Sequence, residues 1–230
     1  MATRSPSVSI VNVRKIKFVN NEFYHLYNRG VDKRLIFNNK YDVERFLQCM
    51  EEFNTVSLVG SLYENSFLSP EIRNKRKDKK LVNIIAYCLN PNHYHFILQQ
   101  IITNGISQFI KRLSGGHAWY FNNKYKRSGA LFQGPFKAKF IDSNEYLLHL
   151  SAYVNLNFKV HQLGDQVAKL VKSSWEEYAV DQRFGLCKKN IILDQFNSAK
   201  EYKIFALDAL PALVEKKKND KELADLLLES

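Results

Sequence analysis

Two consecutive strands are predicted within the stretch LVNIIAYCLNPNHYHFILQQ, residues 81–100. Its first half is strongly apolar, an Asn-Pro-Asn turn follows, and its second half is another apolar run. His93 and His95 are separated by one residue in the second strand, so their side chains share a face. Two imidazoles on one face of a strand can converge on a single cation.

The hydrophobic spacing predicts further elements on both sides of this hairpin. They are a strand at 23–28, a helix at 42–53 with Asp42 as its cap, a helix at 106–125, a strand or hairpin within 130–141, and a helix at 144–156. Together with the hairpin they give the order β-α-β-β-α-β-α. This order is typical of an α+β protein with a split βαβ sheet and helices on one face.

The long connection before the hairpin and the C-terminal part have patterns of their own. Residues 56–63 have β-type spacing, and residues 71–80, EIRNKRKDKK, look like an exposed basic loop. The chain after residue 160 looks mostly helical, with candidate helices at 192–207 and 220–228. We therefore expect an α+β part followed by a helical extension.

The composition is that of a basic globular protein. The chain has 230 residues with 34 Lys+Arg and 23 Asp+Glu, which gives a formal net charge of +11. It has no apolar run of the roughly eighteen residues that a membrane span needs, and no secretory leader pattern. Its three cysteines lie far apart without a CxxC pair, which is typical of buried thiols in a reducing compartment. We expect a cytoplasmic protein with a polyanionic partner and no membrane contact.

The positive charge is concentrated in one part of the chain. No Asp or Glu occurs from Lys79 to Ile141, although this stretch holds nine basic residues and many aromatic ones. Such a combination suits contacts with phosphates and exposed bases. The predicted DNA-binding residues are Arg14, Lys15, Lys17, Arg29, Lys111, Arg112, Lys137 and Lys139. Each of these side chains could equally be a solvent-exposed charge.

A second group of chemically active residues lies downstream, in the sequence YVNLN. Tyr153 and Asn157 are four residues apart on a predicted helix and share a face. An amide oxygen can bind a hard divalent cation, and a tyrosine beside that cation can act as a nucleophile on phosphorus. Tyr146 and Tyr120 have no asparagine four residues further on. Tyr153 is therefore the better candidate.

These motifs resemble those of the single-tyrosine transposases of the HUH endonuclease superfamily, and most of all those of the REP-associated branch. The stretches that carry the resemblance are YHLYNRGVDKRLIF (24–37), YCLNPNHYHFIL (87–98), FNNKYKRSGALFQGPFKAKFI (121–141), YLLHLSAYVNLN (146–157) and SSWEEY (173–178). They follow the order found in that family.

The resemblance implies a ferredoxin-like fold with an antiparallel sheet, and an endonuclease or strand transferase that cleaves single-stranded DNA beside a hairpin. His93, His95 and Asn157 would bind Mg²⁺ or Mn²⁺. Tyr153 would attack a DNA phosphate, keep the 5′ end as a phosphotyrosine and release a 3′ hydroxyl. The implied partner is single-stranded or hairpin DNA, and the implied location is the cytoplasm, in association with the nucleoid. Both a homodimer and a monomer are compatible with the resemblance.

The same resemblance divides the chain into three parts. Residues 1–20 form a basic N-terminal arm, residues 21–160 the HUH single-tyrosine nuclease domain, and residues 161–230 a mostly helical C-terminal extension.

Two alternatives to this interpretation remain open. The chain could be a non-catalytic protein that binds hairpin or repeat DNA on the same fold. It could also be an unrelated metal hydrolase with an activated water, in which His117 or His149 joins His93 and His95. A covalent link between protein and DNA would distinguish the first interpretation from both.

Overall fold

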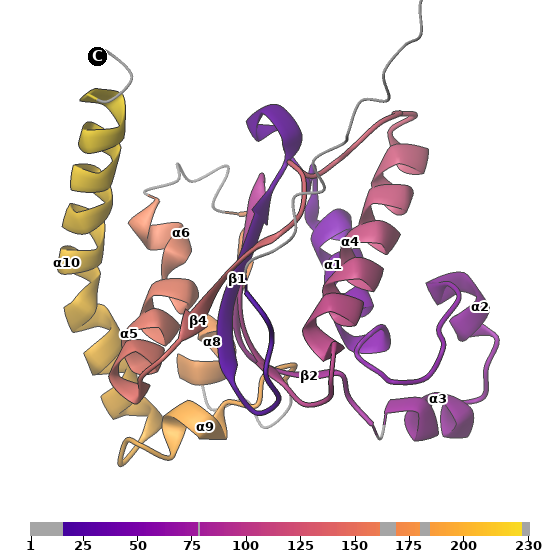
Figure 1. Cartoon of the computed structure of the whole chain (residues 1–230), viewed down its shortest axis with the longest axis horizontal. Coiled ribbons are helices and arrows are strands. Elements are labelled where there is room, and N and C mark those ends of the chain that lie inside the picture. Colours follow the sequence, from indigo (N-terminus) through magenta and orange to yellow (C-terminus); the bar gives the residue numbers. More distant parts are fainter. Residues whose placement is uncertain (1–15, 78, 162–168, 180–184, 227–230) are drawn as a thin grey trace, which may run out of the picture.

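The computed structural model describes residues 16–77, 79–161, 169–179 and 185–226. Its centre is a five-stranded sheet with the order β4-β1-β3-β2-β5, in which neighbouring strands are antiparallel (Figure 1). The strands are β1 (Phe23–Arg29), β2 (Val82–Asn90), β3 (His93–Gln100), β4 (Lys137–Ile141) and β5 (Lys172–Ser173). The predicted α+β class with a split βαβ antiparallel sheet is confirmed.

Helices cover both faces of this sheet (Figure 1). On one face lie α1 (Lys40–Glu52) and α4 (Gly105–Lys124), the two helices between the strands of the predicted unit. The opposite face is covered by α5 (Asn144–Asn155), α8 (Trp175–Ala179) and α10 (Ala199–Leu226). The predicted packing of helices on one face of the sheet therefore holds for α1 and α4. Helix α5 instead packs on the other face, together with the C-terminal extension. Within the described residues, no helix has the length and apolar character needed to cross a membrane.

Strand β3 separates two hydrophobic cores, because alternate side chains of a strand point to opposite faces. Tyr94 and Phe96 are fully buried in the core on the side of α1 and α4. Ile97 belongs to the second core, on the side of α5. His93 and His95 share the face of Ile97, so the fold turns both imidazoles toward the second layer of helices.

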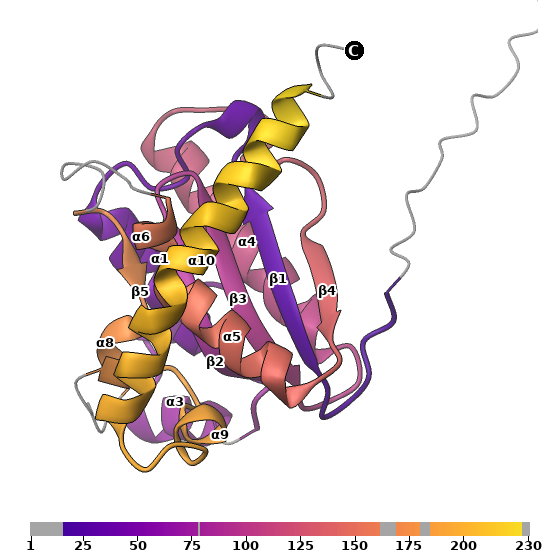
Figure 2. The same ribbon diagram turned by 90° about the vertical axis from the view of Figure 1, so that its left-hand side faces the viewer.

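The C-terminal extension is fixed to α5 by a buried tyrosine. Helix α10 follows the short α9 (Asn190–Leu193) and lies across α5 (Figure 2). The Tyr202 hydroxyl of α10 accepts a hydrogen bond from Asn155 Nδ2 (2.8 Å) and pairs with Ser151 Oγ (3.0 Å). Because all three side chains are fully buried, these bonds position α10 relative to the sheet.

Two segments before the hairpin differ from their predicted structure. The β-type run at 56–63 forms no strand. Instead, α2 (Leu62–Ser66) begins within it. The basic segment predicted as a loop contains the helix α3 (Pro70–Lys77), which starts with proline at the one helical position where a missing N–H costs nothing.

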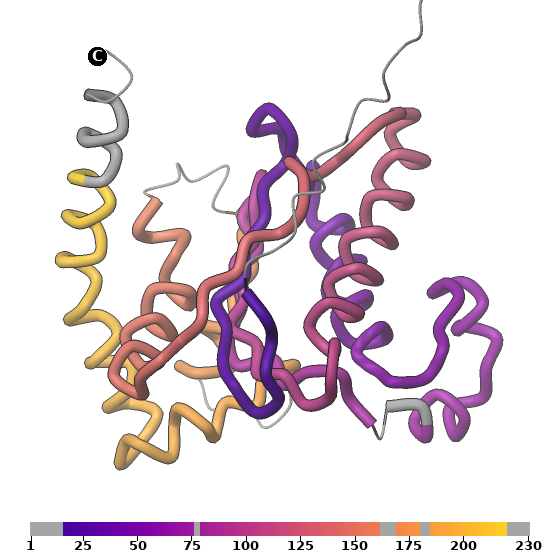
Figure 3. Tube along the Cα trace, viewed as in Figure 1, coloured from indigo at the N-terminus to yellow at the C-terminus, as the bar shows by residue number. Residues whose placement is uncertain are grey.

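The connection between α4 and β4 passes the end of β1 (Figure 3). Phe132 forms an isolated bridge with Gly30, and the Gln133 N–H donates to the Arg29 carbonyl (2.8 Å). Arg29 pairs with His93 in the register of β1 and β3. The connection therefore lies at the end of the sheet where the histidine strand begins.

A short 3-10 helix, η1 (Val31–Lys33), leads from β1 toward α1, whose start differs from the prediction. The N-cap is Asn39, not Asp42. The Asp42 N–H donates to Asn39 Oδ1 (3.2 Å), and the Asn39 N–H donates to Asp42 Oδ2 (3.3 Å). This is a capping box, in which an acidic side chain at the third helical position completes the cap.

Asp42 is also the centre of a buried hydrogen-bond network. Its carboxylate accepts hydrogen bonds from Lys124 Nζ (2.6 Å), Tyr125 Oη (2.8 Å), Tyr120 Oη (3.0 Å) and the Asn38 N–H (2.8 Å). Burial by itself would raise the pKa of Asp42. These hydrogen bonds, the strongest from Lys124, outweigh the burial and hold the pKa below its usual value. The network ties the start of α1 to the end of α4.

We expect Asp42→Asn to lower the free energy of unfolding by about 3 kcal/mol, because Lys124 and two tyrosine hydroxyls lose a charged acceptor. Stability that comes from a lowered carboxyl pKa is present above the unfolded pKa, about 3.9, and is lost as the pH falls through the folded pKa. Urea denaturation from about pH 3 to about pH 7 should therefore show a weaker pH dependence in the variant. Glu44→Gln, at an exposed carboxylate of the same helix, is the control, and an equal loss there would contradict the assignment.

Candidate functional site

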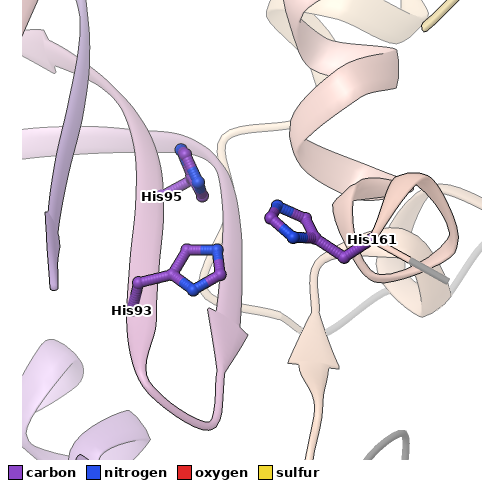
Figure 4. A group of neighbouring side chains, drawn as sticks. All are labelled: His93, His95 and His161. Carbon is purple, nitrogen blue, oxygen red and sulfur yellow. The ribbon is translucent and has the colours of Figure 1, made fainter. Parts of the chain in front are cut away.

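Three imidazoles meet at the end of the sheet where β2 turns into β3 (Figure 4). His93 and His95 extend from β3, and His161 follows α6 (Asn157–Val160) on the facing side. The ligand nitrogens of these three residues, here called the histidine group, all lie within 4.8 Å of one another. No other cluster of three or more His, Cys, Asp or Glu ligands occurs in the part of the chain that the structure describes.

A fourth histidine, His25 of β1, contacts His95 of the histidine group. His25 Nε2 and His95 Nδ1 are 2.9 Å apart and share one hydrogen, which leaves His95 Nε2 for the group. The two rings are stacked, with centroids 5.2 Å apart. A second partner of this kind fixes the orientation and the tautomer of a metal-binding histidine.

Asparagine side chains surround His93 and link it to the predicted ligand Asn157. Asn92 Oδ1 lies 2.7 Å from His93 Nδ1, and Asn90 Nδ2 lies 3.0 Å from His93 Nε2. Asn90 Nδ2 also donates to Asn157 Oδ1 (2.8 Å). Asn90 and Asn157 are fully buried, and Asn157 Nδ2 has no hydrogen-bond partner among the described residues. His93, Asn90 and Asn157 therefore form one polar cluster.

Tyr153 lies beside this cluster near the end of α5. Its ring makes edge contacts with the rings of His95 and His25, at centroid separations of 5.7 Å and 6.3 Å. Tyr153 and His95 line a cleft with a volume of about 780 Å³, together with Lys217 of α10. The structure thus brings together the predicted nucleophile and the predicted metal ligands, although β3 and α5 are far apart in the sequence.

The sequence predicted one helix that carries both Tyr153 and Asn157. In the structure, the helix that carries Tyr153 ends before Asn157. Helix α5 ends at Asn155, and α6 begins at Asn157 after Leu156, whose backbone lies outside the helical region (φ −102°, ψ 11°). Ser173 Oγ donates to the Asn155 carbonyl (3.0 Å), which a continuous helix would use for its own next turn. This break reorients the chain, so that Asn157 and the residues after it face β3.

Burial lowers the pKa of every imidazole at the site. It lowers the pKa of His93 to about 4, with a further contribution from the positive charge of Lys217. Burial also lowers the pKa of His161 to about 3 and the pKa of His25 to about 4, and it holds the pKa of His95 well below its usual value. The imidazoles are therefore neutral at neutral pH, which is the form that binds a metal ion.

The predicted DNA-binding residues near the cleft come from β1 and β4. Arg29 and Lys137 line the cleft. Lys139 is two residues further along β4, and its Nζ lies 4.8 Å from the centre of the Tyr146 ring. Arg29 and Lys137 thus place positive charge at the cleft, and Lys139 lies outside its lining.

The other predicted DNA-binding residues lie away from the cleft. Arg14 and Lys15 are outside the described residues, and Lys17 is exposed in the segment before β1. Lys111 and Arg112 are on α4, which covers the opposite face of the sheet (Figure 1). Arg112 Nη1 donates to a backbone carbonyl in the segment after α1 (2.5 Å), so its guanidinium group stabilises the fold there.

The two histidines considered as third ligands of a metal hydrolase are not in the histidine group. His117 is buried between α1 and α4, where its Nε2 lies 2.7 Å from the Ile36 carbonyl oxygen. His149 is exposed on α5, and its ring packs against Phe205 at a centroid separation of 5.2 Å. The third imidazole is that of His161.

Four residues at the site are not predicted from the sequence: His25, Asn90, His161 and Lys217. For His161 a signal exists, because it follows Asn157 by four residues, the spacing of one helical turn. For Lys217 there is none, since its position depends on how α10 packs across α5.

Comparison with known proteins gives two matches. Residues 65–157 match the family model of IS200-like transposases, a segment that contains His93, His95, Tyr153 and Asn157. The predicted resemblance to single-tyrosine transposases is confirmed over this segment. Among solved structures, the chain is similar to a REP-associated tyrosine transposase bound to a REP hairpin, with 11% identity, a TM-score of 0.46, and coverage of 77% of this chain and 90% of that one. A comparison with curated protein sequences finds no match.

Proposed function

We propose that the chain is a single-tyrosine DNA endonuclease and strand transferase that acts on single-stranded DNA beside a hairpin. The observation that carries the proposal is the position of Tyr153, whose ring contacts that of His95 at the wall of the cleft. The match to IS200-like transposases supports the same activity.

In the proposed reaction, the Tyr153 hydroxyl oxygen attacks a DNA phosphorus atom. A bond forms between this oxygen and phosphorus while the bond from phosphorus to the 3′ oxygen breaks, so the 5′ end remains on the protein as a phosphotyrosine. The phenol proton passes to solvent, and the released 3′ oxygen takes up a proton. Because one phosphate ester replaces another, a 3′ hydroxyl can later reverse the link, which allows strand transfer without an external energy source.

Two features of the cleft support this role for a phenol, whose pKa is near 10 in water. The ammonium group of Lys217 lines the same cleft as Tyr153, and a nearby positive charge favours the phenolate. Arg29 and Lys137 line the cleft as well, so a DNA phosphate would meet positive charge next to the nucleophile.

The side chains at the site fit a divalent cation, for which we propose Mg²⁺ or Mn²⁺. Neutral imidazoles of His93 and His95 offer nitrogen ligands, and Asn157 offers an amide oxygen beside them. A bound cation would polarise the scissile phosphate and neutralise its developing charge.

The proposal is tested by a covalent-adduct assay with the full-length chain and a library of single-stranded hairpin oligonucleotides. We expect a protein–DNA species that survives denaturation in the presence of Mg²⁺ or Mn²⁺ and is absent with a chelator. Hairpin binding without an adduct under any metal condition would instead support the non-catalytic alternative. Cleavage without a protein–DNA link would support the metal hydrolase.

We expect the double variant Lys137→Ala/Lys139→Ala to bind hairpin DNA about 10-fold more weakly and to reduce the salt dependence of binding by about one to two counterions. The physical reason is that alternate residues of β4 share a face, so both ammonium groups reach the same stretch of DNA backbone. Fluorescence anisotropy at several salt concentrations measures the slope. The matched control is Lys200→Ala/Lys203→Ala, at two exposed lysines of α10. An unchanged slope in the β4 variant would reject these contacts.

A further inference from the structure

The site contains one more metal-binding side chain than the family resemblance supplies. His161 lies one turn after Asn157, and its N–H donates to the Asn157 carbonyl (3.0 Å). Its ring centroid is 4.8 Å from that of His93 (Figure 4). The segment that matches the transposase family ends at Asn157, so His161 is outside it. We propose that His161 is a third imidazole ligand of the ion held by His93 and His95, an inference that rests on the proposed function.

The spacing of the histidine group supports a shared ion. Its ligand nitrogens lie within 4.8 Å of one another. Imidazole nitrogens that each bind one ion at about 2.0–2.1 Å are about 3.4 Å apart in a tetrahedral arrangement. Small side-chain rotations therefore close the group around an ion. His161 is only partly buried and lines the cleft, so its ring can rotate without disturbing either core.

The hydrogen bonds of Asn157 favour a further ligand beside it. Asn157 Oδ1 already accepts a hydrogen bond from Asn90 Nδ2 (2.8 Å), which occupies one of its two lone pairs. Asn90 is fully buried, and its Nδ2 also donates to His93 Nε2 (3.0 Å), so Asn90 must release that nitrogen before His93 binds an ion. An amide oxygen with one lone pair engaged is a weak ligand by itself. The imidazole of His161, one helical turn after Asn157, adds a stronger metal ligand next to His93.

The break between α5 and α6 makes this placement possible. With the helix interrupted at Leu156, the turn that contains Asn157 and His161 faces the start of β3. Lys217 of α10 lines the same cleft as His93 and His161. Its positive charge suits an anionic substrate in that cleft. His161 thus closes the site on the side opposite β3.

The third imidazole changes which ions should bind. Imidazole ligands suit first-row transition ions, whereas Mg²⁺ prefers oxygen ligands and retains water. A site with three imidazoles should therefore bind Co²⁺ much more tightly than Mg²⁺, and the Co²⁺ spectrum should report the loss of one nitrogen ligand.

The test is titration of the full-length chain with CoCl₂, followed by calorimetry and by the visible absorption of bound Co²⁺. We expect His161→Ala to lower the Co²⁺ affinity at least about 10-fold and to shift the absorption bands. His161→Gln, which keeps a polar side chain of similar length, should show the same loss of affinity. His149→Ala, at the exposed histidine of α5, should change neither quantity. Circular dichroism of each variant checks that the fold is retained.

Other outcomes separate this inference from the proposed function. Unchanged Co²⁺ affinity and spectrum in both His161 variants, with a clear loss in His95→Ala, would overturn the inference and leave the proposed function standing. Weaker hairpin binding with unchanged Co²⁺ binding would also overturn it and would make His161 a DNA contact. If the unaltered chain neither binds Co²⁺ nor forms a DNA adduct, the proposed function fails and the inference fails with it.

Discussion

Replacing Tyr153 with phenylalanine is expected to lower covalent adduct formation on hairpin DNA by at least about 1000-fold, because the attacking oxygen is removed. Phenylalanine keeps the ring that contacts His95 and His25, so the fold and the affinity for the hairpin should change little. The measurement is a denaturing gel with an oligonucleotide labelled on the strand downstream of the cleavage site, together with anisotropy for binding.

Tyr146→Phe provides the matched control on the same helix. Tyr146 lies outside the histidine group, and its ring contacts Lys139 instead. Its loss should therefore leave adduct formation close to that of the unaltered chain. The opposite pattern, with the adduct lost in Tyr146→Phe and kept in Tyr153→Phe, would show that Tyr146 is the nucleophile.

The central sheet is predictable because its signals are local. The apolar hairpin at residues 81–100 contains two strands, and the period of two correctly places His93 and His95 on one face and Tyr94 on the other. Local signals fail where a choice depends on distant residues. Helix α5 packs against the sheet on one side and against Tyr202 of α10 on the other, and no periodicity within α5 says which face of the sheet it covers.

In the candidate site, too, residues with a local sequence signal are predicted, and features that depend on distant residues are not. His93 and His95 are found by their spacing, and Tyr153 and Asn157 by a motif and a resemblance. The break at Leu156 is not found, because it depends on a hydrogen bond from Ser173, a residue of the distant β5. His25 is likewise missed, since only the pairing of β1 with β3 reveals its contact with His95. The three-part division of the chain, and the choice between monomer and homodimer, stay predictions.

The second large effect is expected for His93→Ala, which should lower both the affinity for a divalent ion and adduct formation by about 100-fold or more. His93 is only partly buried, so its removal creates little cavity in either core. Asn90, which lies next to His93, keeps its hydrogen bond to Asn157. Calorimetry with MnCl₂ and the adduct assay at several Mn²⁺ concentrations measure the two effects.

The DNA affinity of His93→Ala distinguishes loss of chemistry from loss of binding. The basic residues that line the cleft, Arg29 and Lys137, are untouched, so hairpin affinity measured without metal should stay close to that of the unaltered chain. His149→Ala, at an imidazole outside the histidine group, is the control for removing a histidine and should retain the adduct. Full adduct formation in His93→Ala at low Mn²⁺ would exclude His93 as a ligand. A variant that loses the adduct and also loses hairpin binding would instead indicate that His93 contacts DNA directly, because an ion-binding residue should affect the chemical step far more than the binding of DNA without metal.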